Sequence, residues 1–215
     1  MKFTSPIVIF EIICLLGAIL FLKNGKSIFW KLNIAYLFLA LITEAAGSYM
    51  SSKSENNLWL YNSFVFFEIS FIFIGIWHCL RNYLIPKPMI YIGLGIVYST
   101  YFGFIAKDSI MVFNSIAVTV MSVVFSLYCL YYYYLLLNDE KFIEIKYHPE
   151  FWWITGVLFY YFGGTVCNLL SDIFDVRLGK GLTLRYAITI ALNLILYSIW
   201  TYSYLCRAKQ QKLRS

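Results

Sequence analysis

The chain has 215 residues, of which 61% are hydrophobic, 20% aromatic and 13% charged, and its net charge is +6. Soluble globular proteins are about 45 to 50% apolar and about 25% charged, so this composition excludes an ordinary soluble domain. It indicates a protein whose apolar surface faces a lipid bilayer.

Seven apolar stretches predict seven transmembrane helices. A helix of about 20 residues, rising about 1.5 Å per residue, crosses a hydrocarbon core of about 30 Å. Short polar segments rich in Lys, Asn, Ser, Gly and Pro separate the stretches and are typical of loops. We therefore predict an all-α fold, a polytopic seven-helix bundle that forms a single domain over residues 1–215. The expected helices span about 6–22, 28–50, 58–80, 89–105, 110–136, 151–171 and 182–206.

The basic residues predict the orientation of this bundle in the cell membrane. If the N-terminus is outside, eleven of the 17 Lys and Arg residues fall on the cytoplasmic side, which the positive-inside rule favours. The tail "RAKQQKLRS" then anchors the C-terminus near anionic lipid headgroups, and no nucleic acid is expected as a partner. The first stretch contains Glu11 and lacks a small-residue cleavage pattern, so we expect it to stay as a helix. The six residues on the outer side are Lys2, Lys53, Lys107, Arg177, Lys180 and Arg185.

Six of the seven predicted helices carry one strongly polar residue at the midplane of the membrane or on its outer side. An acid at the centre of a span costs about 2.5 to 3.5 kcal/mol, so such groups normally face the bundle interior or a water-filled cavity. We predict one outward-facing polar pocket. As alternatives, the asparagines could serve only as hydrogen bonds between helices, and Glu11 could reach the headgroups. The expected ligand-binding residues are Glu44, Glu68, Asn168, Asn193, Tyr61, Glu11, Asn114 and Tyr197.

Helical spacing groups several of these residues on common faces. Tyr61, Glu68 and Gly75 recur every seven residues on the third predicted helix, and Gly75 is expected to let a neighbouring backbone approach. The seventh predicted helix carries the longest polar and aromatic stripe of the chain. Its members are Tyr186, Thr189, Asn193, Tyr197 and Trp200.

Cysteines and histidines give no sign of a metal or redox centre. The five cysteines form no C-x-x-C pair and are expected to pack as small apolar residues. The two histidines, His78 and His148, are far apart in sequence, and His78 is expected at the membrane interface. We expect no cofactor, and because common hydrolase and nucleotide-binding motifs are missing, no enzymatic activity.

Two aromatic-rich segments support a family resemblance. "LWLYNSFVFFE" at the start of the third predicted helix and "FWWITGVLFYYFGG" at the start of the sixth resemble motifs of small bacterial seven-helix membrane proteins of uncharacterised function. The resemblance covers most of the chain. It implies a sensory membrane subunit that accompanies signalling proteins.

Two functions remain open from the sequence. In the first, the protein is a sensor or receptor-like subunit that binds a small ligand, lipid or proton and signals through a membrane or cytoplasmic partner. In the second, it is a transporter or channel for a small solute or cation, with Glu68 as the coupling group.

Overall fold

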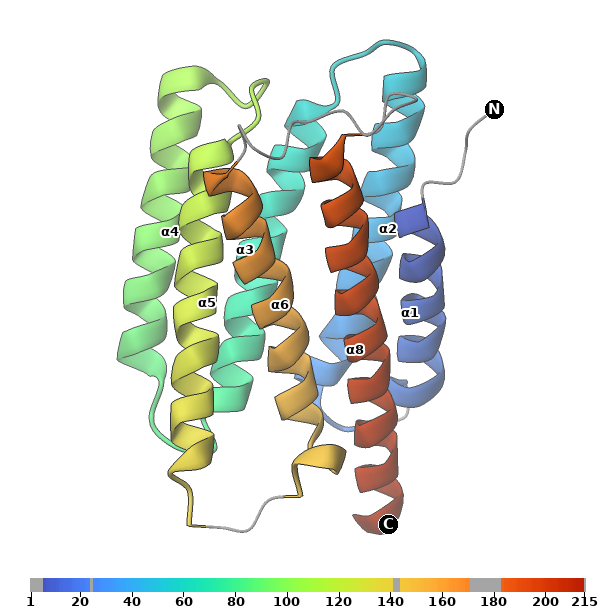
Figure 1. Ribbon diagram of the computed structural model, residues 1–215, viewed down its shortest axis with the longest axis vertical. Coiled ribbons are helices and arrows are strands. Elements are labelled where there is room, and N and C mark those ends of the chain that lie inside the picture. The colour runs from blue at the N-terminus through green and yellow to red at the C-terminus, as the bar shows by residue number, and fades with distance from the viewer. Residues whose placement is uncertain (1–5, 24, 141–143, 171–182, 215) are drawn as a thin grey trace.

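The structure is a computed structural model that describes residues 6–23, 25–140, 144–170 and 183–214. Within these residues all regular structure is helical, with seven α-helices, one short 3-10 helix and no strand (Figure 1). The predicted all-α class is therefore confirmed for the described residues. The helices are α1 (Pro6–Leu22), α2 (Ile28–Ser52), α3 (Leu58–Leu80), α4 (Lys87–Asp108), α5 (Ser115–Leu137), η1 (Ile145–Tyr147), α6 (Pro149–Leu169) and α8 (Leu184–Arg214).

The four prolines of the chain all lie where helices begin. Pro6 and Pro149 are the first residues of α1 and α6, and Pro86 and Pro88 flank the first residue of α4. The first helical positions have no intrahelical partner for the backbone N–H, and the fixed φ of proline suits them. Proline thus sets the starts of these helices without breaking any of them.

Five helices, namely α2, α3, α4, α5 and α8, are long and apolar enough to cross a membrane. The apolar helix α1 is shorter, with 17 residues, and α6 is rich in Trp, Tyr and Gly. Many large apolar side chains, such as Leu20, Tyr91 and Leu127, project from the outside of the bundle. A hydrocarbon environment removes the cost of exposing them, as in a membrane-embedded protein.

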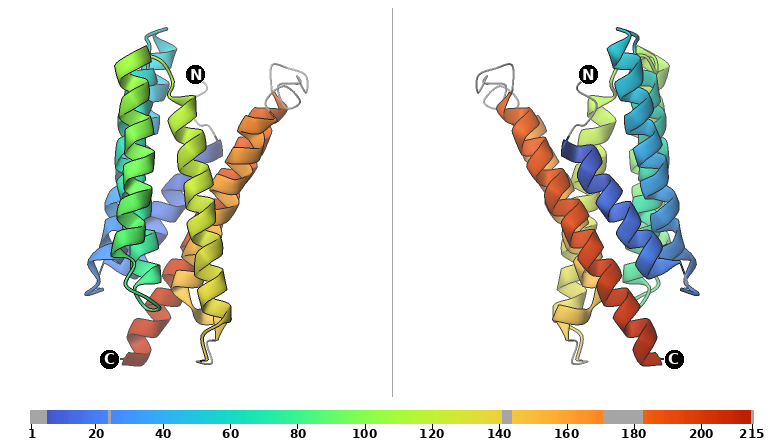
Figure 2. Two further views of the ribbon diagram at one scale, coloured as in Figure 1. Left: turned by 90° about the vertical axis from the view of Figure 1, so that its left-hand side faces the viewer. Right: turned by 90° about the vertical axis from the view of Figure 1, so that its right-hand side faces the viewer.

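The seven α-helices form a closed ring. Each packs against its neighbour in sequence from α1 to α6, α6 packs against α8, and α8 returns to α1. Helix α3 also contacts α5 and α6, which makes it the most central element and the most buried of the five long apolar helices. The side views show α6 and α8 leaning away from α3 and α4 toward one end of the molecule (Figure 2).

We call this end, where α1 begins and which is at the top of Figure 1, the upper end, and the other the lower end. Helix α8 finishes at the lower end. The lower end carries most of the described basic residues, including Lys23, Lys26, Lys31, Arg81, Lys87, Lys146 and Lys209, and the upper end has Lys53, Lys107 and Arg185.

Two helix boundaries differ from the sequence prediction by five residues or more. Helix α5 begins at Ser115, not near residue 110, because Ser109 turns the chain with a positive φ of 78° and the next residues form a turn despite their apolar character. Helix α8 continues to Arg214, well past residue 206, since Ala, Lys, Gln, Leu and Arg are good helix formers even where they are too polar for lipid. Some predicted features lie outside the described residues. They are the end of the sixth predicted helix at 171, the start of the seventh at 182, and the basic residues Lys2, Lys141, Arg177 and Lys180.

Candidate functional site

A cavity of about 290 Å³ lies in the upper half of the bundle, enclosed by α1, α2, α3, α6 and α8. Helix α5 adds Val118 to its wall, and Phe113 comes from the turn before α5. Six of the eight residues predicted from the sequence line this cavity: Glu11, Glu44, Tyr61, Glu68, Asn193 and Tyr197. We call it the glutamate cavity after its three acids.

Each of the three glutamates accepts a hydrogen bond from a tyrosine of another helix. Tyr61 of α3 donates to Oε2 of Glu44 on α2 at 3.3 Å, and Tyr197 of α8 donates to Oε1 of Glu11 on α1 at 3.3 Å. The shortest of the three runs from Tyr161 of α6 to Oε1 of Glu68 on α3, at 2.7 Å. These pairs crosslink the helices and hold the acids in place.

The carboxylates differ in how deeply they are buried. Glu11 is 2% exposed and Glu68 is 9% exposed, whereas Glu44 is half-buried. The second oxygen of Glu11, Oε2, is buried without a hydrogen-bond partner. No Lys or Arg is among the described residues that line the cavity, so nothing in its wall balances an ionised carboxylate.

The polar stripe of α8 faces this cavity through four of its five members. Thr189, Asn193, Tyr197 and Trp200 line the wall, and the amide nitrogen of Asn193 donates to the carbonyl of Thr189 at 2.9 Å. Tyr186, at the start of the stripe, is exposed. Helical periodicity therefore predicts the inward face of α8 correctly from Thr189 onward, but not in its first turn.

Asn168 lies in a second, adjoining cavity of about 160 Å³. The two cavities share wall residues, among them Glu68 and Tyr161. The carbonyl oxygen of Asn168 accepts a hydrogen bond from Arg185 at 3.0 Å, which occupies this end of its side chain. Asn168 thus lies next to the glutamate cavity and is not one of its lining residues.

Asn114 was predicted inside the fifth helix, and this placement is wrong. It is the N-cap of α5: its side-chain oxygen accepts from the N–H of Ala117 at 2.9 Å, and its amide donates to the carbonyl of Tyr101 at 3.2 Å. Its own N–H donates to the side chain of Asn62. Asn114 fixes the α4–α5 turn, as an N-cap asparagine does, and is not among the residues that line the cavity.

A block of buried aromatic rings closes the cavity below. Trp200 lines the cavity and stacks on Trp153 of α6, with ring centroids 5.6 Å apart and planes at 7°. The indole N–H of Trp153 donates to Asn33 at 2.9 Å. Gly75 leaves room for this ring, because a Cβ atom there would overlap Trp153. The close approach at Gly75 is thus made by a side chain and not, as predicted, by a backbone.

A third buried acid, Glu150, lies at the lower end between the two histidines. Its carboxylate oxygens are 3.8 Å from Nε2 of His78 and 3.6 Å from Nδ1 of His148. His78, expected at the interface, is buried and stacks on Phe29 with centroids 4.4 Å apart. This histidine cluster was not predicted because Glu150 lies in a polar segment of the sequence, and only folding brings α3 to it.

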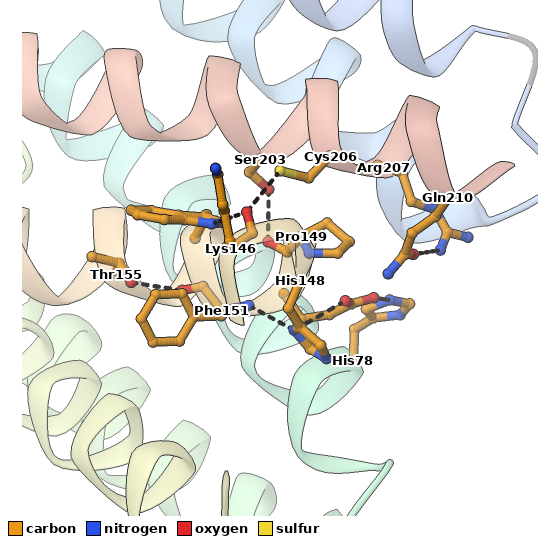
Figure 3. A network of polar contacts seen from close by, with 12 residues as sticks. His78, Lys146, His148, Pro149, Phe151, Thr155, Ser203, Cys206, Arg207 and Gln210 are labelled. Atoms are coloured by element: carbon orange, nitrogen blue, oxygen red, sulfur yellow. Dashed lines mark hydrogen bonds and ion pairs between the residues drawn. The ribbon is translucent and has the colours of Figure 1, made fainter. Parts of the chain in front are cut away.

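The N-cap of α6 belongs to the same cluster. Nδ1 of His148 accepts the N–H of Phe151 at 3.2 Å, as Figure 3 shows beside His78. Because Nδ1 accepts this bond, His148 is neutral in this arrangement. Burial lowers the pKa of His148 from its usual range, and the nearby Glu150 opposes this shift only in part. Ser203 of α8 donates to the carbonyl of Pro149 at 2.8 Å and so ties α8 to the start of α6.

Sequence reasoning left several lining residues out of the predicted site, and three of them are central to its geometry. Tyr161, the donor to Glu68, and Tyr36 and Trp200 also line the cavity. Trp200 could have been included because it belongs to the stripe of α8. Tyr161 carried the same kind of signal, since Tyr161, Gly164, Thr165 and Asn168 follow helical spacing on the sixth predicted helix, whereas Tyr36 had none in a chain rich in tyrosine.

Comparison with protein-family models, with curated proteins and with solved structures finds no match for this chain. Among the described residues, no group of three His, Cys, Asp or Glu side chains could hold a metal ion. The chemistry of the cavity itself is therefore the basis for a functional assignment.

Proposed function

We propose that the protein is an integral membrane sensor or receptor-like subunit that binds a small ligand, lipid or proton in the glutamate cavity and signals through a partner. The observation that carries this proposal is the convergence of three carboxylates and their tyrosine donors, from five helices, on one cavity. Placing acids at this depth is costly, and intramembrane acids usually serve a function. Binding, rather than catalysis, is the role we assign to them.

The proposal includes a multi-pass topology in the cell membrane, with seven crossings and the N-terminus outside. The closed ring of helices, five of them long and apolar enough to cross a membrane, supports this topology, as does the excess of described basic residues at the lower end, which becomes the cytoplasmic side. The cavity then lies on the outer side of the membrane, and the histidine cluster on the inner side.

A continuous series of aromatic contacts supports signalling between the two sides. Trp200 at the cavity floor stacks on Trp153, and Trp153 contacts Phe29 edge-on with centroids 5.2 Å apart. Phe29 in turn stacks on His78, which faces Glu150. A ligand that binds two arrangements of this column with different affinity would shift their populations. The described residues contain no soluble output domain, so a partner protein carries the response in this proposal.

The second candidate is a carrier for a small solute or cation. Its support is Glu68, which lies near the middle of α3, in the wall of both adjoining cavities. A carboxylate at that depth suits a coupling group that alternates between proton and substrate. The packed tryptophans below the cavity speak against an open channel in this arrangement.

Reconstitution separates the two candidates. A sensor is expected to give no solute flux in liposomes, to co-purify with another chain from its native membrane, and to lose the response of that partner in Glu68→Gln. A carrier is expected to give uptake that collapses in the same variant. Glu55→Gln is the matched control, since Glu55 is exposed at the same end of the bundle. If Glu44→Gln combined with Glu68→Gln leaves both flux and partner response intact, the cavity is not the functional site.

A further inference from the structure

The unpartnered oxygen of Glu11 is the first observation that points to a ligand site in the cavity. Glu11 is 2% exposed, it lines the cavity, and its Oε2 has no hydrogen-bond partner. Leaving a buried polar atom unpaired is costly, and more so for a charged one. The same acid already accepts a bond from Tyr197 on its other oxygen, so the open oxygen is the one available to a ligand.

The charge of the cavity selects a cationic ligand. Three glutamates line it, and no Lys or Arg is among its described lining residues. The nearest arginine in the adjoining cavity, Arg185, donates to Asn168. Buried carboxylates without a counter-charge must take up protons or bind a cation.

The aromatic wall favours an organic cation. Tyr36, Tyr160, Tyr161 and Trp200 line the cavity together with the glutamates. The face of a tyrosine or tryptophan ring attracts ammonium groups, and sites that recognise methylated ammonium ligands combine such rings into a cage. A bare metal ion gains far less from this wall than from oxygen ligands in a compact shell.

The size and layout of the cavity also argue against a metal ion. The glutamates are on three different helices, and among the described residues no three acids or other ligating side chains are grouped closely enough for a metal. The volume of about 290 Å³ is far larger than an ion needs. It is close to the lower limit of small-molecule sites, about 300 Å³.

We propose that the glutamate cavity is a binding site for a small organic ammonium ion, held by the carboxylate of Glu11, with Glu68 beside it and the rings of Tyr197 and Trp200 around it. This inference deepens the sensor proposal and rests on it. Because protons and the ammonium group compete for the same carboxylates, the affinity rises with pH. A neutral molecule of the same shape binds more weakly, since it leaves the acids uncompensated.

Probe cations of known structure test the proposal. The full chain in detergent is titrated with choline, tetramethylammonium and butylammonium, and with 3,3-dimethyl-1-butanol as the neutral counterpart of choline, at constant ionic strength set with NaCl. Thermal unfolding and the change in intrinsic tryptophan fluorescence report binding. At least one cation is expected to stabilise the chain, with an affinity at least about tenfold higher than that of the neutral alcohol. The effect is expected to be lost in Glu11→Gln and to be retained in Glu55→Gln.

Tyr197→Phe provides a second readout if Glu11→Gln does not fold. It keeps the ring and removes only the donor to Glu11, so binding is expected to weaken while the cation remains preferred over the alcohol. Equal binding of choline and the alcohol, or no cation effect beyond that of NaCl, overturns the inference. In either case the sensor proposal stands if Glu68→Gln still abolishes the partner response. Conversely, if the cation binds but Glu68→Gln leaves the partner response unchanged, the binding site is supported and the sensor proposal is overturned.

Discussion

The three tyrosine–glutamate pairs show how single residues define this site. Each pair joins two helices, and each tyrosine satisfies one carboxylate oxygen in a cavity that has no basic side chain among its described lining residues. Tyrosine suits this role because its ring packs among apolar neighbours while its hydroxyl donates. The unpartnered Oε2 of Glu11 is the exception, which is why the ligand proposal depends on this atom.

Gly75 allows the tryptophan floor to form. Substitution Gly75→Ala is expected to destabilise the protein by about 1 to 3 kcal/mol, because the added methyl group overlaps the ring of Trp153. The same substitution at Gly95, which has no atoms within 4 Å of the added Cβ, is expected to cost nothing. Thermal unfolding in detergent measures both. Equal midpoints for the two variants would show that the floor tolerates a displaced Trp153.

Helix α6 depends on a titratable residue at its start. Folding lowers the pKa of His148, so the unfolded chain takes up a proton at higher pH than the folded one. The contribution of neutral His148 is therefore complete above about pH 6.5 and is lost as the pH falls below that value. We expect the unfolding midpoint to drop more between pH 7 and pH 5 in the native chain than in His148→Asn.

Asparagine is the suitable replacement because it accepts a hydrogen bond at an N-cap and does not titrate. His78 and Glu150 are present in both proteins, so the variant changes only the group at position 148 and its contact with Glu150. Parallel pH profiles for the native chain and the variant would show that protonation of His148 does not affect folding.

At the level of helices, the sequence predicts which side chains face away from lipid, but not which residues cap helices or form contacts between remote helices. The inward direction of Glu11, Glu44 and Glu68 follows from the cost of an acid in hydrocarbon. The role of Asn114 does not, because an asparagine near the end of an apolar run can cap a helix as well as face a pocket. The partner of Glu150 comes from α3, which is remote in sequence, so no local pattern reveals the histidine cluster.

At the level of the molecule, the closed ring places the two polar sites at opposite ends. The all-α fold was predictable from length and hydropathy alone, whereas the order of helices around the ring depends on side-chain packing that periodicity does not specify. The contact between α8 and α1 closes the ring and brings Tyr197 to Glu11, residues separated by most of the chain. The site thus exists only in the complete bundle.

Cysteine labelling tests the orientation of the bundle. All five native cysteines are buried, so an exposed engineered cysteine reports its own side of the membrane. A membrane-impermeant maleimide is expected to label Glu55→Cys on intact cells and to label Lys26→Cys only after permeabilisation, because these residues are exposed at opposite ends. The native chain, whose cysteines are buried, is the negative control for labelling. The reverse pattern would invert the proposed topology.

The length of α8 has a mechanical consequence. Its 31 residues extend about 46 Å, longer than a hydrocarbon core of about 30 Å, and its basic last turns pack at the lower end of the bundle, where Arg207 lies over the ring of Trp30 and Gln211 lies beside Gly25. The same helix carries Asn193, Tyr197 and Trp200 in the wall of the cavity. In the proposed sensor, a tilt of α8 at that wall therefore displaces the contacts of its last turns at the lower end, and this displacement is the change presented to the partner.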